Sequence, residues 1–569
     1  MEINIKFKKL ISNRNEILVG VFFTIILYLS TTPFEVFPFE LSAPILLTSS
    51  FILGTLTVLT TILIFSRVKI YLPSYREGIF SYIIIVMISV SFFKTGLNIW
   101  LLYFFLLFVI SLFIFNLKQH NLFSLNTLVV PLSIVILFEV IKELFHIKGL
   151  YIPLLNNFSN NNIKAIYLVF ALPFFLTYFK NQKRIQFLMF FLMTFICLYL
   201  QCRTALIGIL ILIVIILNEQ KNKLNTLNSY KLKKTLFTGI FILSIFIILL
   251  SIRKSESNVG RLLIFGQTLS LITDNPFTGS GFGSFQKQIT LKLEEYFSSD
   301  RPEQIQDNFK SQINIAYNDC IQLIVENGLL GFCLFLSIGM IIYQTRKKGL
   351  LYNVIPILYL FMSLVNSLIY AVPCGIILSM WIGYNYEIKS HSIPTFFAFF
   401  PILLIFSFYI YYSFALYTVT IEGNDNLTIP KLSLKKLKNK RYILNSNSYY
   451  WKVVGKKFFL ENKLSFAETA LIKSIEIDRN LNSMLLLSKV YKEMKEYRAQ
   501  YRILMSINRI VPGSITPKYD LFKYYLNRKD SLSATNYALQ ILNFSNKFNS
   551  LKIANIKLEA NQFIIKRTN

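Results

Sequence analysis

The sequence has few charged residues. Only 15% of its 569 residues are Asp, Glu, Lys or Arg, whereas a soluble domain carries about a quarter. Hydrophobic residues make up 54%, and the mean hydropathy is +0.52. The apolar residues form long runs separated by short charged clusters, which is typical of a chain that crosses a membrane many times. This pattern excludes an ordinary soluble globular protein.

Histidine and cysteine are also scarce, with three and five residues respectively. The sequence contains no C-x-x-C pair and no zinc-type spacing, so it offers no recognisable metal or redox motif. Cys197, Cys333 and Cys374 lie in or beside apolar runs and are expected to pack there. Cys202 and Cys320 both fall on the side assigned below as external, which leaves a bridge between them open.

Acidic residues are half as frequent as basic ones, 29 against 59, and the net charge is +30. Roughly half of this positive charge follows Thr418, and most of the rest lies in short loops between apolar runs. Loop charge of this kind reports membrane topology rather than nucleic-acid binding. No nucleic-acid partner is therefore expected.

The apolar runs predict an all-α fold, a polytopic membrane helix bundle of about 13 spans across a core of about 30 Å. The first run resembles a signal peptide, but no small-residue cleavage site follows it, so we interpret it as a retained span. The spans are expected to begin at Ile17, Pro44, Ile79, Leu97, Ser124, Ile163, Ile185, Thr204, Thr235, Ile321, Leu351, Ala371 and Thr395.

The basic clusters predict the orientation of these spans. A cytoplasmic N-terminus puts the clusters at 67–76, 180–184, 221–234 and 346–348 inside, as the positive-inside rule requires. A large loop of about 253–320 then lies outside. The odd number of spans places the C-terminus outside as well. The predicted domains are a membrane domain at 1–420, a basic linker at 421–442 and a helical domain at 443–569.

The C-terminal domain shows a repeat of about 34 residues that resembles tetratricopeptide repeats, in which small residues let paired helices approach and aromatic residues fill between them. A generic helical bundle is the alternative. The matching positions are Trp451, Gly455, Phe458, Ala467 and Leu471, then Ser488, Tyr491, Tyr497, Leu504 and Pro512, and more weakly Phe522, Tyr525, Ala534 and Ala538.

Three external segments contain residues that could carry chemistry. Arg203 follows Gln201-Cys202 between two spans, against the positive-inside trend, although an arginine there can simply reach lipid headgroups. The large loop holds Arg261 and a glycine-rich stretch. Gly279, Gly281 and Gly283 let backbone N–H groups turn toward an anion or pack closely.

The third segment begins a helix at the outer surface. Asn318 or Asp319 can cap this helix. Glu326 lies about two turns further in, and a carboxylate below the membrane interface is costly unless it is paired or solvated. Tyr317 and Gln322 flank these acidic residues.

Together the three segments resemble the O-antigen ligase and polymerase superfamily. Its members share an S-R-x-A turn, a G-R-x-x-x-W stretch leading to P-x-x-G-x-G, and an H-N-x-x-L-Q-x-x-x-E-x-G helix start, in this order. The segment 156–173 also resembles a family segment that leads into a span ending in Pro. The resemblance covers about 150–335. Three positions depart from it: Cys202 replaces Ser, Phe265 replaces Trp, and Tyr317 stands where many members have His.

The resemblance implies a glycosyltransferase of the bacterial inner membrane. Family members move a glycan from undecaprenyl diphosphate to an acceptor hydroxyl on the external face, without a metal, so no cofactor is expected. Arginine suits the diphosphate because its planar fork binds phosphate oxygens in pairs. The resemblance thus assigns Arg203 and Arg261 to the diphosphate, with Lys164 as a weaker candidate.

The missing histidine leaves the general base open. Asp319 is the first choice and Glu326 the second, while Tyr317 could orient a sugar and Asn318 and Gln322 could bind hydroxyls. The acceptor could be lipid A-core in lipopolysaccharide biosynthesis, a growing glycan or a protein. The repeat domain could bind a protein partner. A transporter of lipid-linked glycan is the alternative from another class, but it should carry more charge within its spans.

Overall fold

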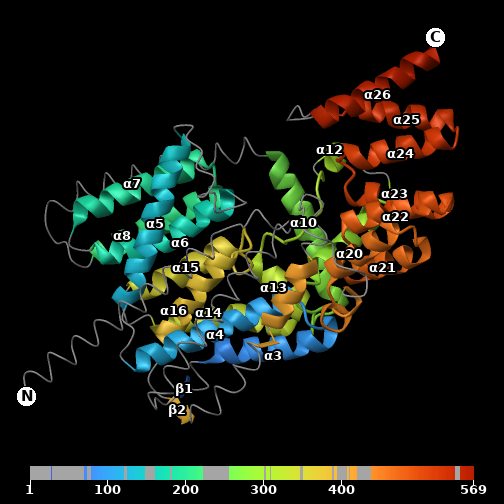
Figure 1. The fold of residues 1–569 in the computed structure, drawn as a ribbon. Helices are drawn as coiled ribbons and strands as arrows, with labels where there is room; N and C mark the ends of the chain where they lie inside the picture. Colours follow the sequence, from blue (N-terminus) through green and yellow to red (C-terminus); the bar gives the residue numbers. More distant parts are fainter. Residues whose placement is uncertain are drawn as a thin grey trace, which may run out of the picture. The chain divides into compact units, whose positions relative to one another are not determined.

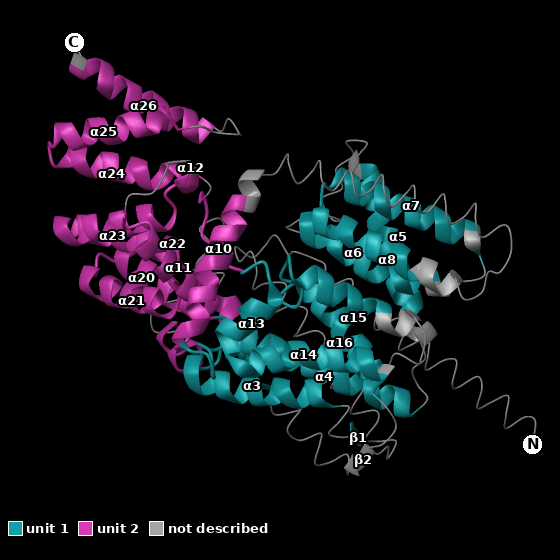
Figure 2. Cartoon of the chain, turned by 180° about the vertical axis from the view of Figure 1, so that it is seen from behind, with its two compact units in different colours: residues 1–254, 275–283, 316–414 teal, residues 255–274, 284–315, 415–569 magenta. Residues whose placement is uncertain are grey.

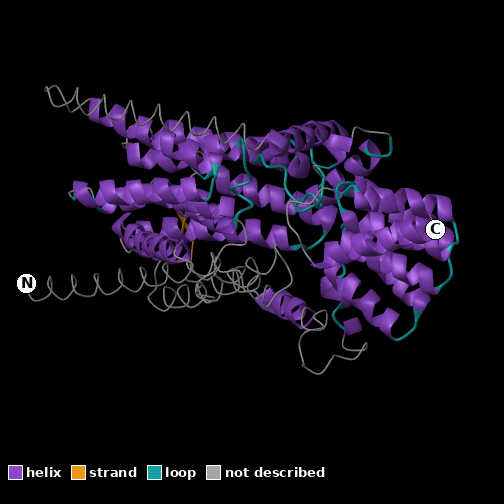
Figure 3. Ribbon diagram, turned by 90° about the horizontal axis from the view of Figure 1, so that it is seen from above, coloured by secondary structure: helices purple, strands orange, loops and turns teal. Residues whose placement is uncertain are grey.

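The computed structural model describes residues 27, 70–73, 78–120, 125–147, 161–179, 182–221, 255–299, 303–307, 309–345, 350–386, 390–393, 407–408, 410–419, 437–544 and 551–568. Nearly all regular structure in these residues is helical (Figure 3). The chain divides into two compact units (Figure 2). The first unit comprises Met1–Lys254, Asn275–Gly283 and Ala316–Phe414, and the second comprises Ser255–Asp274, Ser284–Ile315 and Ala415–Asn569.

The helices of the first unit begin within two residues of nine predicted span starts. They are α3 (Ile79–Thr95), α4 (Ile99–Gln119), α5 (Leu125–Ile147), α6 (Asn161–Tyr178), α7 (Lys183–Tyr199), α8 (Arg203–Lys221), α13 (Asp319–Asn327), α14 (Leu329–Thr345), α15 (Leu350–Ser363) and α16 (Val372–Asn385) (Figure 1). The predicted spans beginning at Ile17, Pro44, Thr235 and Thr395 lie wholly or mostly outside the described residues.

Among the described helices, α4 alone is both long and apolar enough to qualify as a membrane span by length and composition. Seven further helical segments are apolar but shorter. The number of spans therefore stays a prediction.

Close helix contacts form the core of the first unit. α4 packs along α16, α3 packs on α4 and α14, and α6 packs on α5 and α8. Two glycines allow the close approach of α16 to α4. A Cβ atom at Gly383 would lie 2.1 Å from the carbonyl oxygen of Ser111, and one at Gly375 would lie 2.1 Å from the hydroxyl of Tyr103.

One short sheet departs from the all-α prediction. Strands β1 (Ile70–Pro73) and β2 (Ser390–Ile393) pair antiparallel, with Ile70 opposite Ile393. Asn116, near the end of α4, fixes this ribbon because its side-chain amide accepts from the N–H of Tyr71 (2.7 Å) and donates to the same residue's carbonyl (3.0 Å). Two short segments that connect apolar runs thus pair with each other.

The predicted span beginning at Ile321 is not one continuous helix. It is divided into α13 and α14 at Gly328, whose φ of +59° ends α13. The two helices pack on each other at the break, since a Cβ atom at Gly331 would lie 2.0 Å from the carbonyl oxygen of Leu323. Glu326 therefore lies near the end of a short helix, and not two turns into a spanning helix.

The second unit combines part of the large loop with the C-terminal domain. The loop contributes α10 (Ser255–Asp274), α11 (Phe285–Tyr296) and α12 (Glu303–Gln306). The C-terminal domain contains α19 (Arg441–Leu444), α20 (Ser448–Leu460), α21 (Leu464–Ile477), α22 (Leu481–Glu493), α23 (Tyr497–Ile510), α24 (Ile515–Asn527), α25 (Ser531–Leu542) and α26 (Leu551–Thr568).

Helices α20 to α25 form three successive pairs (Figure 1). The pairs begin at Ser448, Leu481 and Ile515, a spacing of 33 and 34 residues. Gly455 lets α20 approach α21, since a Cβ atom there would lie 2.7 Å from Cγ of Leu471. This spacing agrees with the expected repeat, while the assignment to the tetratricopeptide family stays a prediction.

Candidate functional site

A short turn between α15 and α16, residues 364–369, connects two of the predicted motifs within the first unit. The side-chain amide of Asn366 donates to the hydroxyl of Thr204 at the start of α8 (3.2 Å). At the start of α13, the side-chain amide of Asn318 donates to the carbonyl of Leu364 in the same turn (3.0 Å). The turn therefore holds the Arg203 segment and the Tyr317–Asp319 segment in one polar framework.

Asp319 is the strongest anchor of this turn. One carboxylate oxygen, Oδ2, accepts hydrogen bonds from the backbone N–H groups of Leu368 (3.0 Å) and Ile369 (2.8 Å). The residue is fully buried. Two hydrogen bonds to one carboxyl oxygen therefore fix the backbone just before α16.

One residue of this framework, Tyr317, has a strained backbone. Its φ is +55°, in the left-handed region that side chains other than glycine rarely occupy, whereas the φ of +51° at Gln201 belongs to the left-handed residue that ends α7. Tyr317 is partly exposed and directly precedes Asn318, whose side chain caps α13 by accepting from the N–H of Ile321 (3.1 Å). Backbone strain of this kind concentrates at functional sites and costs about 1–3 kcal/mol per residue.

Gln322 lies one turn into α13 and is buried. Its side-chain oxygen accepts from the backbone N–H of Ala316 (3.0 Å) and, more weakly, from the hydroxyl of Ser367 (3.4 Å). The predicted hydroxyl-binding residue thus supports the backbone that leads into Tyr317.

Arg203 is the first residue of α8 and is partly exposed. A guanidinium at this position adds to the partial positive charge of the helix start, a combination that favours an anion. The preceding Cys202 is buried, and its thiol lies 3.7 Å from the carbonyl of Asn162 at the start of α6. All five cysteines are free, so Cys202 and Cys320 form no bridge.

Lys164 lies in the first turn of α6, where its ammonium group is ion-paired with Glu143 of α5. A second pair, Lys142 with Glu139 at 3.5 Å, lies on the same face of α5, and all four side chains are buried. A buried cation is stable only when it is paired. Lys164 is therefore bound to a protein carboxylate in this structure.

Glu326 lies near the C-terminal end of α13, two residues before Gly328. Its carboxylate accepts a hydrogen bond from the hydroxyl of Tyr370 (2.7 Å) and is buried. The ring of Tyr370 in turn contacts Trp100 and Phe104, with ring centroids 5.3 Å and 5.7 Å away. Glu326 is thus paired with a neutral hydroxyl inside an aromatic cluster.

The three loop glycines pack against this part of the first unit. The N–H of Gly281 donates to the carbonyl of Glu326 (2.6 Å), and the N–H of Gly279 donates to Asn275 (3.0 Å). All three have positive φ, and a Cβ atom at Gly283 would lie 2.4 Å from the ring of Trp100. In this structure these glycines provide close backbone packing, and the amides of Gly279 and Gly281 bind protein carbonyls.

Arg261 belongs to the second unit. It lies on α10, within a helix and not in an irregular loop, and is partly exposed. Within the first unit, the 364–369 turn connects the segment of Arg203 to the segment 317–322, while Arg261 is held by a different set of contacts.

Sequence reasoning missed the residues that hold the site together. Asn366 and Ser367 are the only adjacent polar pair in the short loop at 364–373, a signal that could have identified them. Lys94 was also missed. Its ammonium group donates to the hydroxyl of Thr278 (2.6 Å) and to the carbonyl of Gly279, and thereby fixes the glycine loop to the end of α3.

The comparison with protein families gives a match over residues 160–336, to a family described as O-antigen ligase. The match covers the segment whose motifs resemble this family, and it confirms that resemblance. The comparison with curated proteins found no match.

Proposed function

We propose that this chain, whose residues 160–336 match a family described as O-antigen ligase, transfers a glycan from undecaprenyl diphosphate to an acceptor hydroxyl on the external face of the membrane. The observation that carries this proposal is the 364–369 turn. It joins the start of α8, with Arg203, to the start of α13, with Tyr317. Two separate family motifs thus share one polar framework.

The chemistry needs a cation more than it needs a strong nucleophile. The carrier diphosphate is already a good leaving group, so the protein mainly has to hold its developing negative charge. Arg203 suits this role because it is partly exposed at a helix start. Arg261 is the second proposed cation. Lys164, being paired with Glu143, would contribute only if that ion pair opened.

The proton of the acceptor hydroxyl needs a base within hydrogen-bond reach. Asp319 remains the first candidate, but its full burial and its two backbone hydrogen bonds also support a positioning role. Tyr317 is partly exposed, stands in the place of the family histidine and is proposed to orient a sugar hydroxyl. Glu326, held by Tyr370, is the second candidate base.

A protein O-oligosaccharyltransferase is the second candidate function, and the helix pairs of the second unit favour it. Stacked helix pairs form extended surfaces that bind macromolecules, so they suit a protein acceptor. A polysaccharide polymerase differs from both only in its acceptor, which is the growing glycan.

Deletion of the gene separates these activities. A ligase defect leaves full-length glycan on the carrier, and a polymerase defect leaves single repeat units that still reach the acceptor. A protein transferase defect spares lipopolysaccharide and removes glycan from proteins. Loss of a transporter would instead keep the lipid-linked sugar on the inner leaflet, inaccessible to an external glycosidase. Carrier-linked glycan that neither accumulates nor changes length would contradict the proposal.

A further inference from the structure

We propose that the C-terminal helix pairs are a positioning module for the large loop. In this proposal the three turns that follow α21, α23 and α25 hold the loop segment 284–315, and through it the helix that carries Arg261. The role of Arg261 rests on the proposed function, whereas the attachment of the loop to the helix pairs does not.

The first point of attachment is the turn between α21 and α22. The guanidinium of Arg479 forms an ion pair with Glu294 of α11, and both side chains are largely buried, with 25% and 18% exposed. The ammonium group of Lys287, also on α11, donates to the carbonyl of Glu476. Ion pairs shielded from water are screened less by salt than those on the surface, so this contact ties α11 firmly to the turn.

One glutamine side chain reinforces the same attachment. The amide nitrogen of Gln312 donates to the carbonyl of Arg479 (2.7 Å) and to the hydroxyl of Thr290 on α11 (3.1 Å). Its oxygen accepts from the backbone N–H of Leu481 at the start of α22 (3.3 Å). Gln312 thus connects both ends of the loop segment to one turn.

The second and third points of attachment lie further along the helix pairs. The N–H of Gly513, between α23 and α24, donates to the carbonyl of Phe309 (3.0 Å). A Cβ atom at Gly513 would lie 2.6 Å from the carbonyl oxygen of Gln306, so the loop backbone packs directly on this glycine. The ammonium group of Lys310 lies 5.6 Å from the ring centre of Phe544, just after α25. The loop segment 284–315 therefore contacts the three turns that follow α21, α23 and α25.

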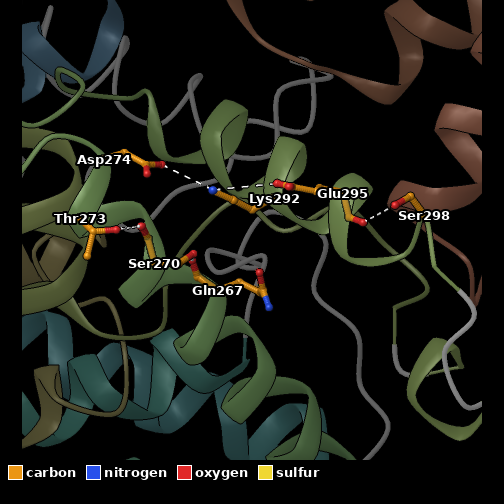
Figure 4. A network of polar contacts seen from close by, with 7 residues as sticks. All are labelled: Gln267, Ser270, Thr273, Asp274, Lys292, Glu295 and Ser298. Atoms are coloured by element: carbon orange, nitrogen blue, oxygen red, sulfur yellow. Dashed lines mark hydrogen bonds and ion pairs between the residues drawn. The ribbon is translucent and has the colours of Figure 1, made fainter.

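The attachment extends to α10. This helix packs on α11, and the ammonium group of Lys292 on α11 joins Asp274 at the end of α10 (3.7 Å) and Glu295 (3.9 Å) (Figure 4). Arg261 lies on the same α10. A continuous set of contacts therefore runs from the C-terminal turns through α11 to the helix of the proposed diphosphate-binding arginine.

This arrangement has a consequence for topology. Segments that share hydrogen bonds and an ion pair within one compact unit must lie on the same side of a membrane. The loop and the C-terminal domain are thus on one side, whatever the number of spans between them. The separation of Glu294 and Arg479 by 185 residues makes this a strict constraint on the topology.

Cysteine cross-linking tests the attachment. Glu294 and Arg479 are both replaced by Cys in the full chain, and a protease site is inserted within 420–436. We expect the two fragments to stay linked without reductant. All five native cysteines lie in the N-terminal fragment, so Arg479→Cys alone is the control. A second control pairs Glu295→Cys, whose native side chain is 76% exposed, with Arg498→Cys, an exposed position on α23. The attachment is overturned if the test pair links no better than these controls.

Charge exchange tests the positioning role. Glu294→Arg and Arg479→Glu should each lower glycan transfer about 10-fold or more, since a small displacement of a binding group is costly. The double variant should recover to within about 3-fold of the native rate, as coupled pairs do. Glu493→Arg and Arg498→Glu, at exposed positions of α22 and α23, should change little. Unchanged transfer in both single variants would overturn the positioning role. Cross-linking needs no activity, so a failure of the proposed function would remain distinguishable.

Discussion

The side-chain amide of Asn366 donates to the hydroxyl of Thr204 across 3.2 Å, which joins two residues 162 positions apart. Thr204 directly follows Arg203, and Asn366 lies in the turn that Asp319 holds by two backbone hydrogen bonds. The position of the arginine therefore depends on the same polar framework as the start of α13. A hydrogen bond between buried side chains stabilises a fold by about 0.5–1.5 kcal/mol.

Arg203→Ala and Arg261→Ala should each abolish glycan transfer while the protein level in the membrane stays native. Arg203→Lys should restore little activity, because a compact ammonium group cannot copy the planar fork. Glycan display on the acceptor, measured beside the membrane level of each variant, checks this. Near-native display in both alanine variants would contradict the assignment.

Asp319→Asn separates the two roles of this residue. The amide oxygen of Asn can still accept from the N–H groups of Leu368 and Ile369, but it cannot take a proton at neutral pH. A positioning role predicts that Asn keeps most activity and that Ala loses it together with stability. A base predicts that both variants lose activity by about 10²–10⁴-fold while Asn remains stable. The rate of transfer and the thermal midpoint of each variant decide between the roles.

Gly279→Ala should destabilise the first unit. Gly279 has φ +59°, and a Cβ atom there would lie 2.3 Å from the backbone of Glu326, so we expect a loss of about 2 kcal/mol or more. Gly266→Ala is the matched control. This glycine lies within α10 with open space around its Cβ position, so alanine should be neutral or raise stability by up to about 1 kcal/mol. Equal thermal midpoints in detergent would contradict the packing role of Gly279.

The sequence predicted most helix starts in the first unit because each follows from a local apolar run. The prediction failed where one glycine changed the path of the chain. Gly328, whose φ is +59°, follows Glu326-Asn327, and this Asn-Gly pair is a turn signal that the continuous apolar pattern on both sides outweighed in the prediction. It divides one predicted helix in two. The ribbon of Ile70–Pro73 and Ser390–Ile393 was missed for a related reason, since two short segments pair across more than 300 residues.

The candidate site was predictable in its residue types but not in its contacts. Arg203 could be identified because it is a cation on the predicted external side, against the positive-inside rule. The pairing of Lys164 with Glu143 was not predicted, although Glu139, Lys142 and Glu143 lie on one helix face by their spacing. The roles of Asn366 and Gln312 depend on contacts over long sequence distances. Helical periodicity carries no information about such contacts.

The C-terminus is predicted to lie outside the cytoplasm. A fusion after Asn569 to a reporter that is active only in the periplasm should therefore be bright. The same reporter inserted after Ser299, an exposed position in the large loop, should be equally bright. A cytoplasm-specific reporter that works at both sites would show that the orientation is reversed. Opposite results at the two sites would contradict the attachment of loop and tail.

The pH dependence of stability should change in Asp478→Asn. Burial raises the pKa of Asp478 to about 6, and the nearby Lys287 partly opposes this effect. An acid whose folded pKa is raised destabilises the fold when it is ionised, so the cost is present at pH 7 and falls as the pH drops through 6. The variant should therefore be more stable at pH 7–8, by at most about 3 kcal/mol, and this difference should vanish toward pH 4.

Asp530→Asn provides a control of opposite sign. The backbone and side chain of Ser533 lower the pKa of Asp530 by hydrogen bonding. Its ionised form therefore stabilises the fold, and its replacement should lower the thermal midpoint at pH 7. A gain in Asp478→Asn that does not change with pH would mean that it does not come from the raised pKa of the carboxyl group.

The attachment of the loop to the C-terminal turns also determines when the loop can fold, because its contacts form only after the C-terminal helices have been synthesised. Residue 294 leaves the ribosome long before residue 479, so α11 is synthesised before the turn that holds it. Translation proceeds at about 5–20 residues per second, and the loop must wait for roughly ten seconds or more. A chain that ends before residue 479 would lack the turn that holds α11, so Glu294 and Lys287 would lose the partners that they have in the complete protein.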